Sequence, residues 1–326
     1  MSALLEVNNL VTQLRNGTRI VDDISFGIRA GETFALLGES GCGKSMTALS
    51  LLRLLPDGVV RAGGTAQLDG VELFGLRERE MRAVRGGMAA MIFQEPALSL
   101  NPVLTVGQQI AEALALHQDL RGTALQQRCA ELLAQVGIPD AARRVTEYPF
   151  QFSGGMKQRV MIAMALAGQP RLLIADEPTT ALDVTIQAQV LQLLRDTQDA
   201  SGMSLLLITH DLGVVAEMAH RVGVMYAGQI VEQAGREQLF ARPLHPYTQK
   251  LFAALPDAAW RNQPLAAIPG SVPPPGSITR GCRFEPRCDK AWALCGEQTP
   301  EWTMLEDGLG VRCHLYGEGR RGKGEG

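Results

Sequence analysis

Short apolar runs alternate with longer amphipathic segments along most of the chain, and this pattern predicts its fold. The segments with the 3.6-residue spacing of helices are 45–55, 105–166 and 186–200. The apolar runs predict strands at 4–10, 20–28, 33–37, 63–73, 88–93, 171–175, 204–209, 222–226 and 230–233. Mostly apolar strands that alternate with helices are typical of a parallel sheet covered on both faces. We therefore predict an α/β fold whose sheet is interrupted by a helical insert.

The last part of the chain differs in composition from the rest. Residues 268–277, IPGSVPPPGS, cannot form a helix or a central strand and are predicted to be an extended linker. The final GEGRRGKGEG, residues 317–326, is predicted to be disordered. We expect one domain over 1–240, with a helical subdomain at about 96–166, and a C-terminal extension over 241–326.

Composition narrows the class of protein. The chain has 326 residues, of which 46% are hydrophobic, and a net charge of −3 without a basic block, so nucleic acid is not an expected partner. No apolar stretch approaches the ~20 residues that span a bilayer, and the N-terminus lacks a signal-peptide pattern. We expect a cytosolic protein in which disulfides do not form.

The sequence GESGCGKS follows the apolar run 33–37 and precedes a helical segment. Glycines allow a tight turn that points backbone N–H groups inward, and a helix N-terminus attracts an anion. Lysine adds a positive charge and serine a hydroxyl for Mg²⁺, so the segment predicts a site for the phosphates of a nucleotide. The predicted contacts in this loop are Gly38, Glu39, Ser40, Gly41, Cys42, Gly43, Lys44, Ser45 and Met46.

Two adjacent carboxylates follow the apolar run 171–175. Alternation along a strand sends Asp176 and Glu177 in different directions, so one can serve a metal and the other a water. We expect Asp176 to hold Mg²⁺ and Glu177 to act as the general base. His210 follows the run 204–209, at the strand tips where nucleotide sites of parallel sheets lie, and we expect it to hydrogen-bond γ-phosphate oxygens.

Ser153, Gly154 and Gly155 open a predicted helix that runs to Ala167. Serine is a good N-cap, and the paired glycines expose backbone N–H groups at the positive end of the helix. Alone, this pattern indicates only a well-capped helix. As a second anion-binding terminus in one chain, it favours a γ-phosphate that belongs to a nucleotide held by another subunit.

In their order along residues 1–240, these motifs resemble those of ABC-type ATPases. The resemblance also includes Gln94 of the Q-loop, the signature at 152–156 and the D-loop at 181–183. It implies a RecA-like P-loop domain with an antiparallel β subdomain, and a head-to-tail dimer with ATP between one phosphate loop and the opposite signature. It implies catalytic roles for Lys44, Gln94, Glu177 and His210, Mg²⁺ ligands in Ser45, Gln94 and Asp176, and ATP contacts from Ser153, Gly154, Gly155 and Asp183.

Three segments are similar to the ATPases of dipeptide, oligopeptide and nickel importers: residues 93–102, the signature run FSGGMKQRVMIAMAL and the motif HPYT at 245–248. The methionine at position 156 of the signature resembles that of the D-type ATPase subunit, whose partner is an F-type ATPase subunit. The resemblance implies ATP-driven solute import at the cytoplasmic face of the bacterial inner membrane. It also implies two permease subunits and an extracytoplasmic solute-binding protein as partners, and it leaves the solute open.

Two other functions remain open at this point. A soluble ABC ATPase of DNA repair or translation would carry long coiled-coil insertions or tandem cassettes, and the sequence contains neither. A redox- or metal-sensing protein regulated by ATP would depend on the C-terminal cysteines.

One departure from the family concerns the base of the nucleotide. ABC ATPases stack an aromatic residue on the adenine, whereas the corresponding position here is Leu14, and no aromatic residue lies between residues 1 and 23. We therefore expect binding to depend on the phosphates, or on Arg15 or Arg19 stacking on the base.

Four of the six cysteines lie close together in the sequence. Four thiols in a short cytosolic segment predict a metal centre, with His314 as a possible substitute ligand. Their spacings exceed those of common zinc sites and favour a 4Fe–4S cluster over zinc, as in the resembled importers. The predicted ligands are Cys282, Cys288, Cys295 and Cys313. Cys129 is predicted to be a core residue and Cys42 a small filler whose thiol, beside a helix N-terminus, is open to oxidation.

Overall fold

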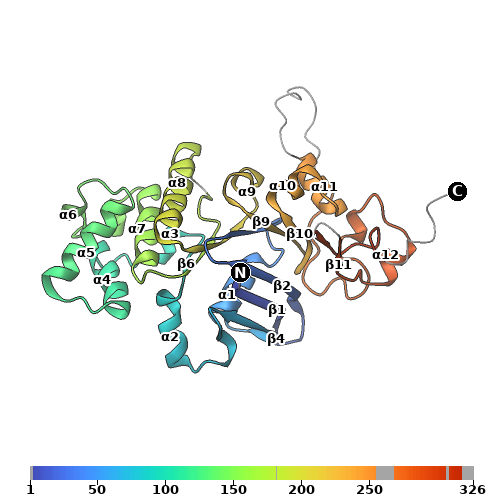
Figure 1. Ribbon diagram of the computed structural model, residues 1–326, viewed down its shortest axis with the longest axis horizontal. Coiled ribbons are helices and arrows are strands. Elements are labelled where there is room, and N and C mark those ends of the chain that lie inside the picture. The colour runs from blue at the N-terminus through green and yellow to red at the C-terminus, as the bar shows by residue number, and fades with distance from the viewer. Residues whose placement is uncertain (1–2, 181, 255–267, 306–307, 318–326) are drawn as a thin grey trace. The chain divides into compact units, whose positions relative to one another are not determined.

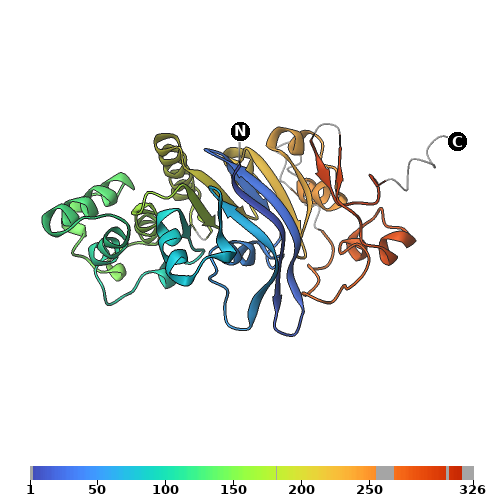
Figure 2. The ribbon, with the colours of Figure 1, turned by 60° about the horizontal axis from the view of Figure 1, so that its bottom comes forward.

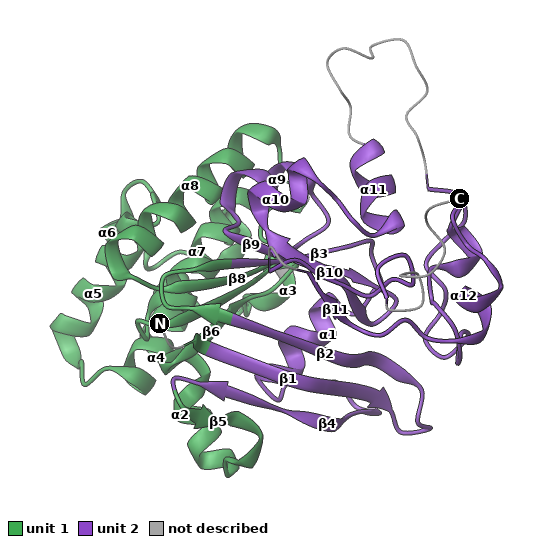
Figure 3. Cartoon of the chain, turned by 45° about the vertical axis from the view of Figure 1, so that its right-hand side comes forward, with its two compact units in different colours: residues 1–4, 28–33, 70–208 green, residues 5–27, 34–69, 209–326 purple. Residues whose placement is uncertain are grey.

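The computed structural model describes residues 3–180, 182–254, 268–305 and 308–317 (Figure 1). The chain forms two compact units, each assembled from separate stretches of the sequence (Figure 3). The first unit comprises residues 1–4, 28–33 and 70–208, and the second comprises residues 5–27, 34–69 and 209–326. Within the described ranges, no helix is both long enough and apolar enough to cross a membrane.

The first unit is built on parallel strands in the order β8–β7–β6. All residues of β6 (Ala89–Ile92), β7 (Leu172–Asp176) and β8 (Ser204–Thr209) are buried, as expected for strands without a solvent-facing side. The predicted parallel sheet of apolar strands is therefore confirmed. The other elements are β5 (Val71–Glu72), η1 (Leu73–Gly75), α2 (Glu78–Gly87), α3 (Pro96–Ser99), α4 (Val106–His117), α5 (Gly122–Gln135), α6 (Ala141–Arg144), η2 (Pro149–Gln151), α7 (Gly154–Leu166) and α8 (Val184–Ser201).

The helical character predicted for residues 105–166 is also confirmed. Helix α4 buries Val106, Ile110 and Leu114, which recur at helical spacing along one face. Cys129 on α5 is 2% exposed and lies in the core, as predicted. Burial raises the pKa of its thiol, so this cysteine is an inert packing residue.

The second unit contains strands in the order β11–β12–β10–β9–β3 and a further sheet in which β1 pairs antiparallel with β4. Figure 2 shows the two long strands β1 and β2 side by side. Strand β3 runs parallel to β9, and β9 runs antiparallel to β10. Its elements, some of which begin or end in the first unit, are β1 (Ala3–Leu14), β2 (Arg19–Arg29), β3 (Thr33–Leu37), α1 (Lys44–Leu51), β4 (Val59–Leu68), α9 (Leu212–Met218), β9 (Arg221–Tyr226), β10 (Gln229–Gly235), α10 (Arg236–Ala241), α11 (Pro246–Ala253), η4 (Glu285–Arg287), α12 (Ala293–Glu297), β11 (Thr303–Met304) and β12 (Gly310–Val311).

Helix α1 is shorter than the predicted 45–55. It ends at Leu51 because the chain turns left-handed at Arg53, with φ of 53°, and the N–H of Leu54 bonds the carbonyl of Leu49. Pro56 then prevents the helix from resuming.

The proline-rich stretch 268–277 contains neither helix nor strand, as predicted for a linker. The predicted disordered tail at 317–326 lies outside the described residues except for Gly317.

The HPYT motif begins helix α11 and is built into the interior. His245 is the N-cap and is 1% exposed, and its Nδ1 accepts the N–H of Tyr247 at 3.0 Å. The carboxylate of Glu232 accepts the N–H groups of Leu244 at 2.7 Å and of His245 at 2.8 Å. Burial lowers the pKa of His245 to about 3, so this imidazole is neutral in the folded protein.

Acid should therefore destabilise the fold through His245. The unfolded chain binds a proton at this residue near pH 6.5 and the folded chain does not, so stability falls as pH drops below 6.5. Between pH 7.5 and 5 this residue should remove about 2 kcal/mol from the free energy of unfolding. Urea unfolding at both pH values should show the loss in the wild type and a smaller one in His245→Asn, which keeps a capping side chain. Equal losses in the two proteins would contradict this role.

Candidate active site

The phosphate loop joins β3 to α1 within the second unit, as the strand–loop–helix prediction requires. Gly43 is the N-cap of α1 with φ of 106°, a conformation that favours glycine. A methyl group on Gly38 would lie 2.2 Å from the carbonyl oxygen of Met225 in β9, so only glycine fits there. The loop therefore turns tightly into the N-terminus of the helix, the end that favours an anion.

Lys44 is 5% exposed and reaches back over the loop. Its Nζ donates to the carbonyl oxygens of Gly38 at 2.7 Å and Glu39 at 3.0 Å. Burial raises the pKa of the Cys42 thiol, which is fully buried behind the loop. Cys42 is therefore a filler, and the expected sensitivity to oxidation is not supported. Of the other loop residues, Ser40 and Gly41 are exposed, and Ser45 and Met46 are half-buried.

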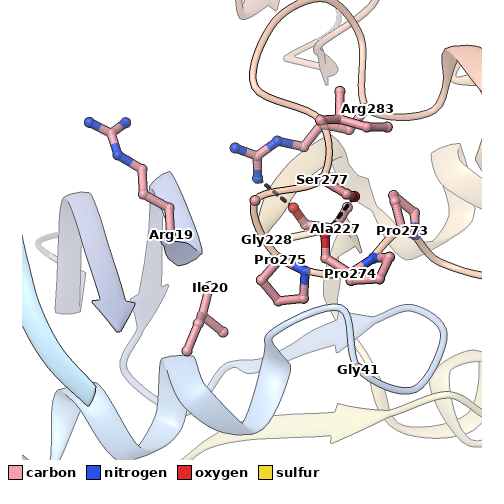
Figure 4. A pocket seen from close by; sticks show the side chains of 12 residues that line it. Arg19, Ile20, Gly41, Ala227, Gly228, Pro273, Pro274, Pro275, Ser277 and Arg283 are labelled. Atoms are coloured by element: carbon pink, nitrogen blue, oxygen red, sulfur yellow. Dashed lines mark hydrogen bonds between the residues drawn. The ribbon is translucent and has the colours of Figure 1, made fainter. Parts of the chain in front are cut away.

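A pocket lies beside the loop in the second unit, lined by Arg19, Gly41, Gly228, Arg283 and three prolines of the linker (Figure 4). Arg19, one of the two residues proposed to stack on the base, pairs with Asp22 at 2.6 Å. The prolines that line the pocket are Pro273, Pro274 and Pro275.

The carboxylates of the first unit lie at the end of β7. Asp176 is buried, and Glu177 takes a left-handed conformation with φ of 48°, so the chain turns between the two. Glu177 Oε2 accepts Gln94 Nε2 at 3.1 Å and Thr180 Oγ1 at 2.9 Å. The structure thus brings Gln94 and Glu177 together although 83 positions separate them in the sequence. These two hydrogen bonds orient the carboxylate at the end of the strand, the position that the sequence predicts for a general base.

The glycine-rich segment of the first unit has the predicted capped start. Ser153 Oγ accepts the N–H of Met156 at 3.4 Å at the beginning of α7, and Ser153 itself is exposed. A methyl group on Gly155 would lie 2.8 Å from Ile186 of α8. Asp183 caps α8 by accepting the N–H of Ile186 at 2.9 Å. The starts of these two helices therefore lie side by side, and both present backbone N–H groups.

His210 lies after the end of β8 with an exposed side chain, at the strand tip where the sequence predicts it. The following Asp211 caps α9 by accepting the N–H groups of Gly213 at 2.7 Å and Val214 at 3.3 Å. The backbone around His210 is therefore fixed by the cap.

The four C-terminal cysteines line one pocket together with His245 and His314. Burial, with a smaller effect of the other three cysteines, raises the pKa of Cys282 to about 12. All six cysteines are free thiols. Thiols are suitable ligands for iron or zinc, but across the described residues no group of three or more His, Cys, Asp or Glu side chains is arranged to hold a metal ion. The expected metal centre in the extension is therefore not supported by the geometry.

A phosphate loop after a parallel strand and paired carboxylates after another such strand define a P-loop ATPase. In the comparisons with known proteins, two family models match this chain. Residues 21–180 match the family model described as ABC transporter. Residues 231–295 match the model described as oligopeptide/dipeptide transporter, C-terminal region.

Similar proteins extend over nearly the whole chain. The oligopeptide transport ATP-binding protein AppD of Bacillus subtilis is 50% identical, covering 98% of each chain. The dipeptide transport ATP-binding protein DppD of Escherichia coli is 48% identical, covering 96% of each. Among solved structures, the ATP-binding cassette MJ0796, a dimer in a post-hydrolysis state with ADP and phosphate, matches with a TM-score of 0.64 at 25% identity, covering 71% of this chain and 98% of that one. The chain belongs to the ABC transporter family and is an ABC-type ATPase.

Proposed function

We propose that this chain hydrolyses ATP to energise the import of dipeptides or oligopeptides, as the ATPase subunit of an ABC importer. The observation that carries the chemistry is the carboxylate of Glu177, held by Gln94 and Thr180 at the end of a buried strand. The cargo class comes from the two similar proteins named for peptide transport and from the match at residues 231–295. Neither these similar proteins nor the match at residues 231–295 favours the two alternatives, a soluble ABC ATPase and an ATP-regulated sensor.

In the proposed reaction, a water attacks the γ-phosphorus, the bond from this phosphorus to the bridging oxygen of ADP breaks, and Glu177 takes a proton from the water. Lys44 and the N–H groups of the phosphate loop neutralise phosphate charge. His210 hydrogen-bonds the γ-phosphate and orients the water. Ser45, Gln94 and Asp176 offer the oxygen ligands that Mg²⁺ prefers, and the bound ion would neutralise charge on the β- and γ-phosphates.

We further propose that residues 1–240 form the nucleotide-binding part and residues 241–326 an extension of it. Two ATPase subunits would join head to tail, this D-type chain with an F-type partner, so that Ser153 and its glycines contact the γ-phosphate held by the partner. Solved dimers of a similar cassette support the dimer. The partners would be two permeases and a solute-binding protein, at the cytoplasmic face of the inner membrane.

Uptake of a labelled peptide tests the proposed function. Removing this chain from a cell that carries the complete transporter should abolish uptake of labelled di- or tripeptides, and the wild-type chain should restore it. The Glu177→Gln variant, expressed at the same level, should fail to restore it. Unchanged peptide uptake without the chain would contradict the peptide cargo, whereas the ATPase assignment would stand.

For the C-terminal cysteines we propose a 4Fe–4S cluster, with zinc as the alternative. The support is the chemistry of the donor set, four thiols that line one pocket, and not the geometry of the described residues, in which no group of three or more such side chains is arranged around a metal. Metal analysis and the visible spectrum of protein purified without oxygen distinguish the two. A chain with neither iron nor zinc would contradict the proposal.

Selection between nucleotides should be weak, because no aromatic residue is available at the position of Leu14. Arg19 lines the pocket beside Gly41, and a guanidinium stacks on any base. Competition binding should give Kd values for ATP and GTP that differ by less than about tenfold. A large preference for ATP would contradict this prediction.

A further inference from the structure

Glu39 is an acidic residue inside the phosphate loop, and its charge is unfavourable beside a nucleotide. A carboxylate near bound phosphates repels them unless a cation neutralises it. Arg287 of η4 supplies that cation. Its Nη1 donates to Glu39 Oε2 at 2.8 Å and its Nη2 donates to Oε1 at 3.0 Å, a two-pronged contact of the geometry that arginine and carboxylate favour.

Arg287 is fixed by its surroundings as well as by Glu39. Its side chain is 6% exposed, Nε donates to the carbonyl of Pro269 at 2.8 Å, and the guanidinium lies 5.8 Å from the ring centre of Tyr226. The hydrogen bonds to Glu39 raise the pKa of Arg287, so the positive charge is permanent. A buried arginine with this many partners holds one position.

The HPYT motif holds the same loop residue through its backbone. The hydroxyl of Tyr247 accepts the N–H of Glu39 at 3.0 Å. Tyr247 is fully buried and packs against Tyr226, with ring centres 4.6 Å apart, and against Phe284 at 5.4 Å. Residues that follow β10 therefore bind both the carboxylate and the backbone N–H of Glu39. The carbonyl oxygen of Glu39 in turn accepts a hydrogen bond from Lys44 Nζ.

We propose that Arg287 is a positioning residue of the ATP site, which neutralises Glu39 and holds the phosphate loop in its binding conformation. The nucleotide affinity of this chain therefore depends on a residue of the C-terminal region, between Cys282 and Cys288. The inference rests on the ATP site, and it needs neither the peptide cargo nor a metal at the cysteines.

The charge of Glu39 predicts the direction in which ATP affinity changes in the single and the double variant. Arg287→Met leaves the Glu39 carboxylate unpaired beside the phosphates, so ATP binding weakens. Adding Glu39→Gln removes that charge while keeping a side chain of the same shape, so binding recovers. Such a recovery would assign the lost affinity to the charge of Glu39 and not to the other contacts of Arg287.

The experiment measures the affinity of the full chain for a fluorescent ATP analogue in four proteins: wild type, Arg287→Met, Glu39→Gln and the double variant. Arg287→Met should bind about tenfold more weakly than wild type, and the double variant should recover most of this loss. A matched control is Arg312→Met, which removes another largely buried arginine of the same unit, paired with Asp23 at 3.3 Å and not with the loop. The control should bind like the wild type.

Two results would overturn the inference: an Arg287→Met variant that binds like the wild type, or a double variant as weak as Arg287→Met. If Arg287→Met does not fold, Arg287→Lys replaces it, because lysine keeps the charge and loses the two-pronged contact. That variant should bind ATP more weakly than the wild type, and wild-type affinity in it would assign the effect to charge alone and overturn the positioning role. A wild-type chain that binds no nucleotide would instead contradict the ATP site itself.

Discussion

Glu177→Gln is expected to lower the rate of ATP hydrolysis by about 10²- to 10⁴-fold, the usual contribution of a general base. The amide has the shape of the carboxylate and cannot accept a proton from water at neutral pH. The phosphate loop lies on other elements and keeps its contacts, so ATP binding should remain within a factor of a few of wild type. Phosphate release by the assembled transporter, and ATP affinity of the isolated chain, measure the two effects separately.

The same variant should accumulate an ATP-bound dimer, because in the proposed cycle ATP joins the subunits and hydrolysis separates them. Size-exclusion chromatography with ATP and Mg²⁺ detects it. A suitable control is Glu112→Gln, which removes an exposed carboxylate from α4 of the same unit and should hydrolyse ATP normally. Hydrolysis at the wild-type rate by Glu177→Gln would remove this residue from its role, and loss of ATP binding would show that it acts on the structure of the site.

The parts of the site that could be predicted from the sequence are those in which neighbouring residues form one unit. Strand β3 and the glycine loop are continuous in the chain, and local sterics at Gly38 and Gly43 define the loop. Ser153 and Asp183 are helix caps, which depend on residues only three positions away. Local chemistry of this kind is visible in a sequence.

Contacts between distant residues could not be predicted in the same way. Arg287 and Glu39 are 248 positions apart, and nothing in the spacing of either indicates the other. In the sequence, HPYT is only a motif shared with the resembled importers. Its physical role, the hydrogen bond from the N–H of Glu39 to the hydroxyl of Tyr247, depends on how α11 packs and is visible only in the structure. For the cysteines, the sequence predicts a site that the geometry does not support. Their type and spacing indicate a metal centre, but the arrangement of ligands depends on side-chain directions, which spacing does not determine.

Ser153→Arg should separate nucleotide binding from hydrolysis in a way that tests whether each ATP site needs two subunits. In the isolated chain, Ser153 only caps α7, so the variant should bind ATP as the wild type does. In the assembled transporter, the bulky side chain would block the helix end proposed to contact the γ-phosphate held by the partner, and hydrolysis at that site should fall by about 10²-fold. Lys44→Ala should instead weaken ATP binding already in the isolated chain, because its ammonium lies over the chain's own loop.

The matched control is Thr105→Arg, because Thr105 caps α4 of the same unit in the same way: its Oγ accepts the N–H of Gln108 at 3.2 Å. Each substitution removes one cap and should cost about 1 kcal/mol of stability, so a difference in hydrolysis cannot come from the lost cap. Thr105→Arg should therefore hydrolyse ATP like the wild type, while Ser153→Arg should not. If the two variants hydrolysed ATP equally well in the transporter, the helix end at Ser153 would contact no phosphate and the site would not be shared. If Ser153→Arg weakened ATP binding in the isolated monomer, the signature would act on the chain's own nucleotide, and the head-to-tail arrangement would be wrong.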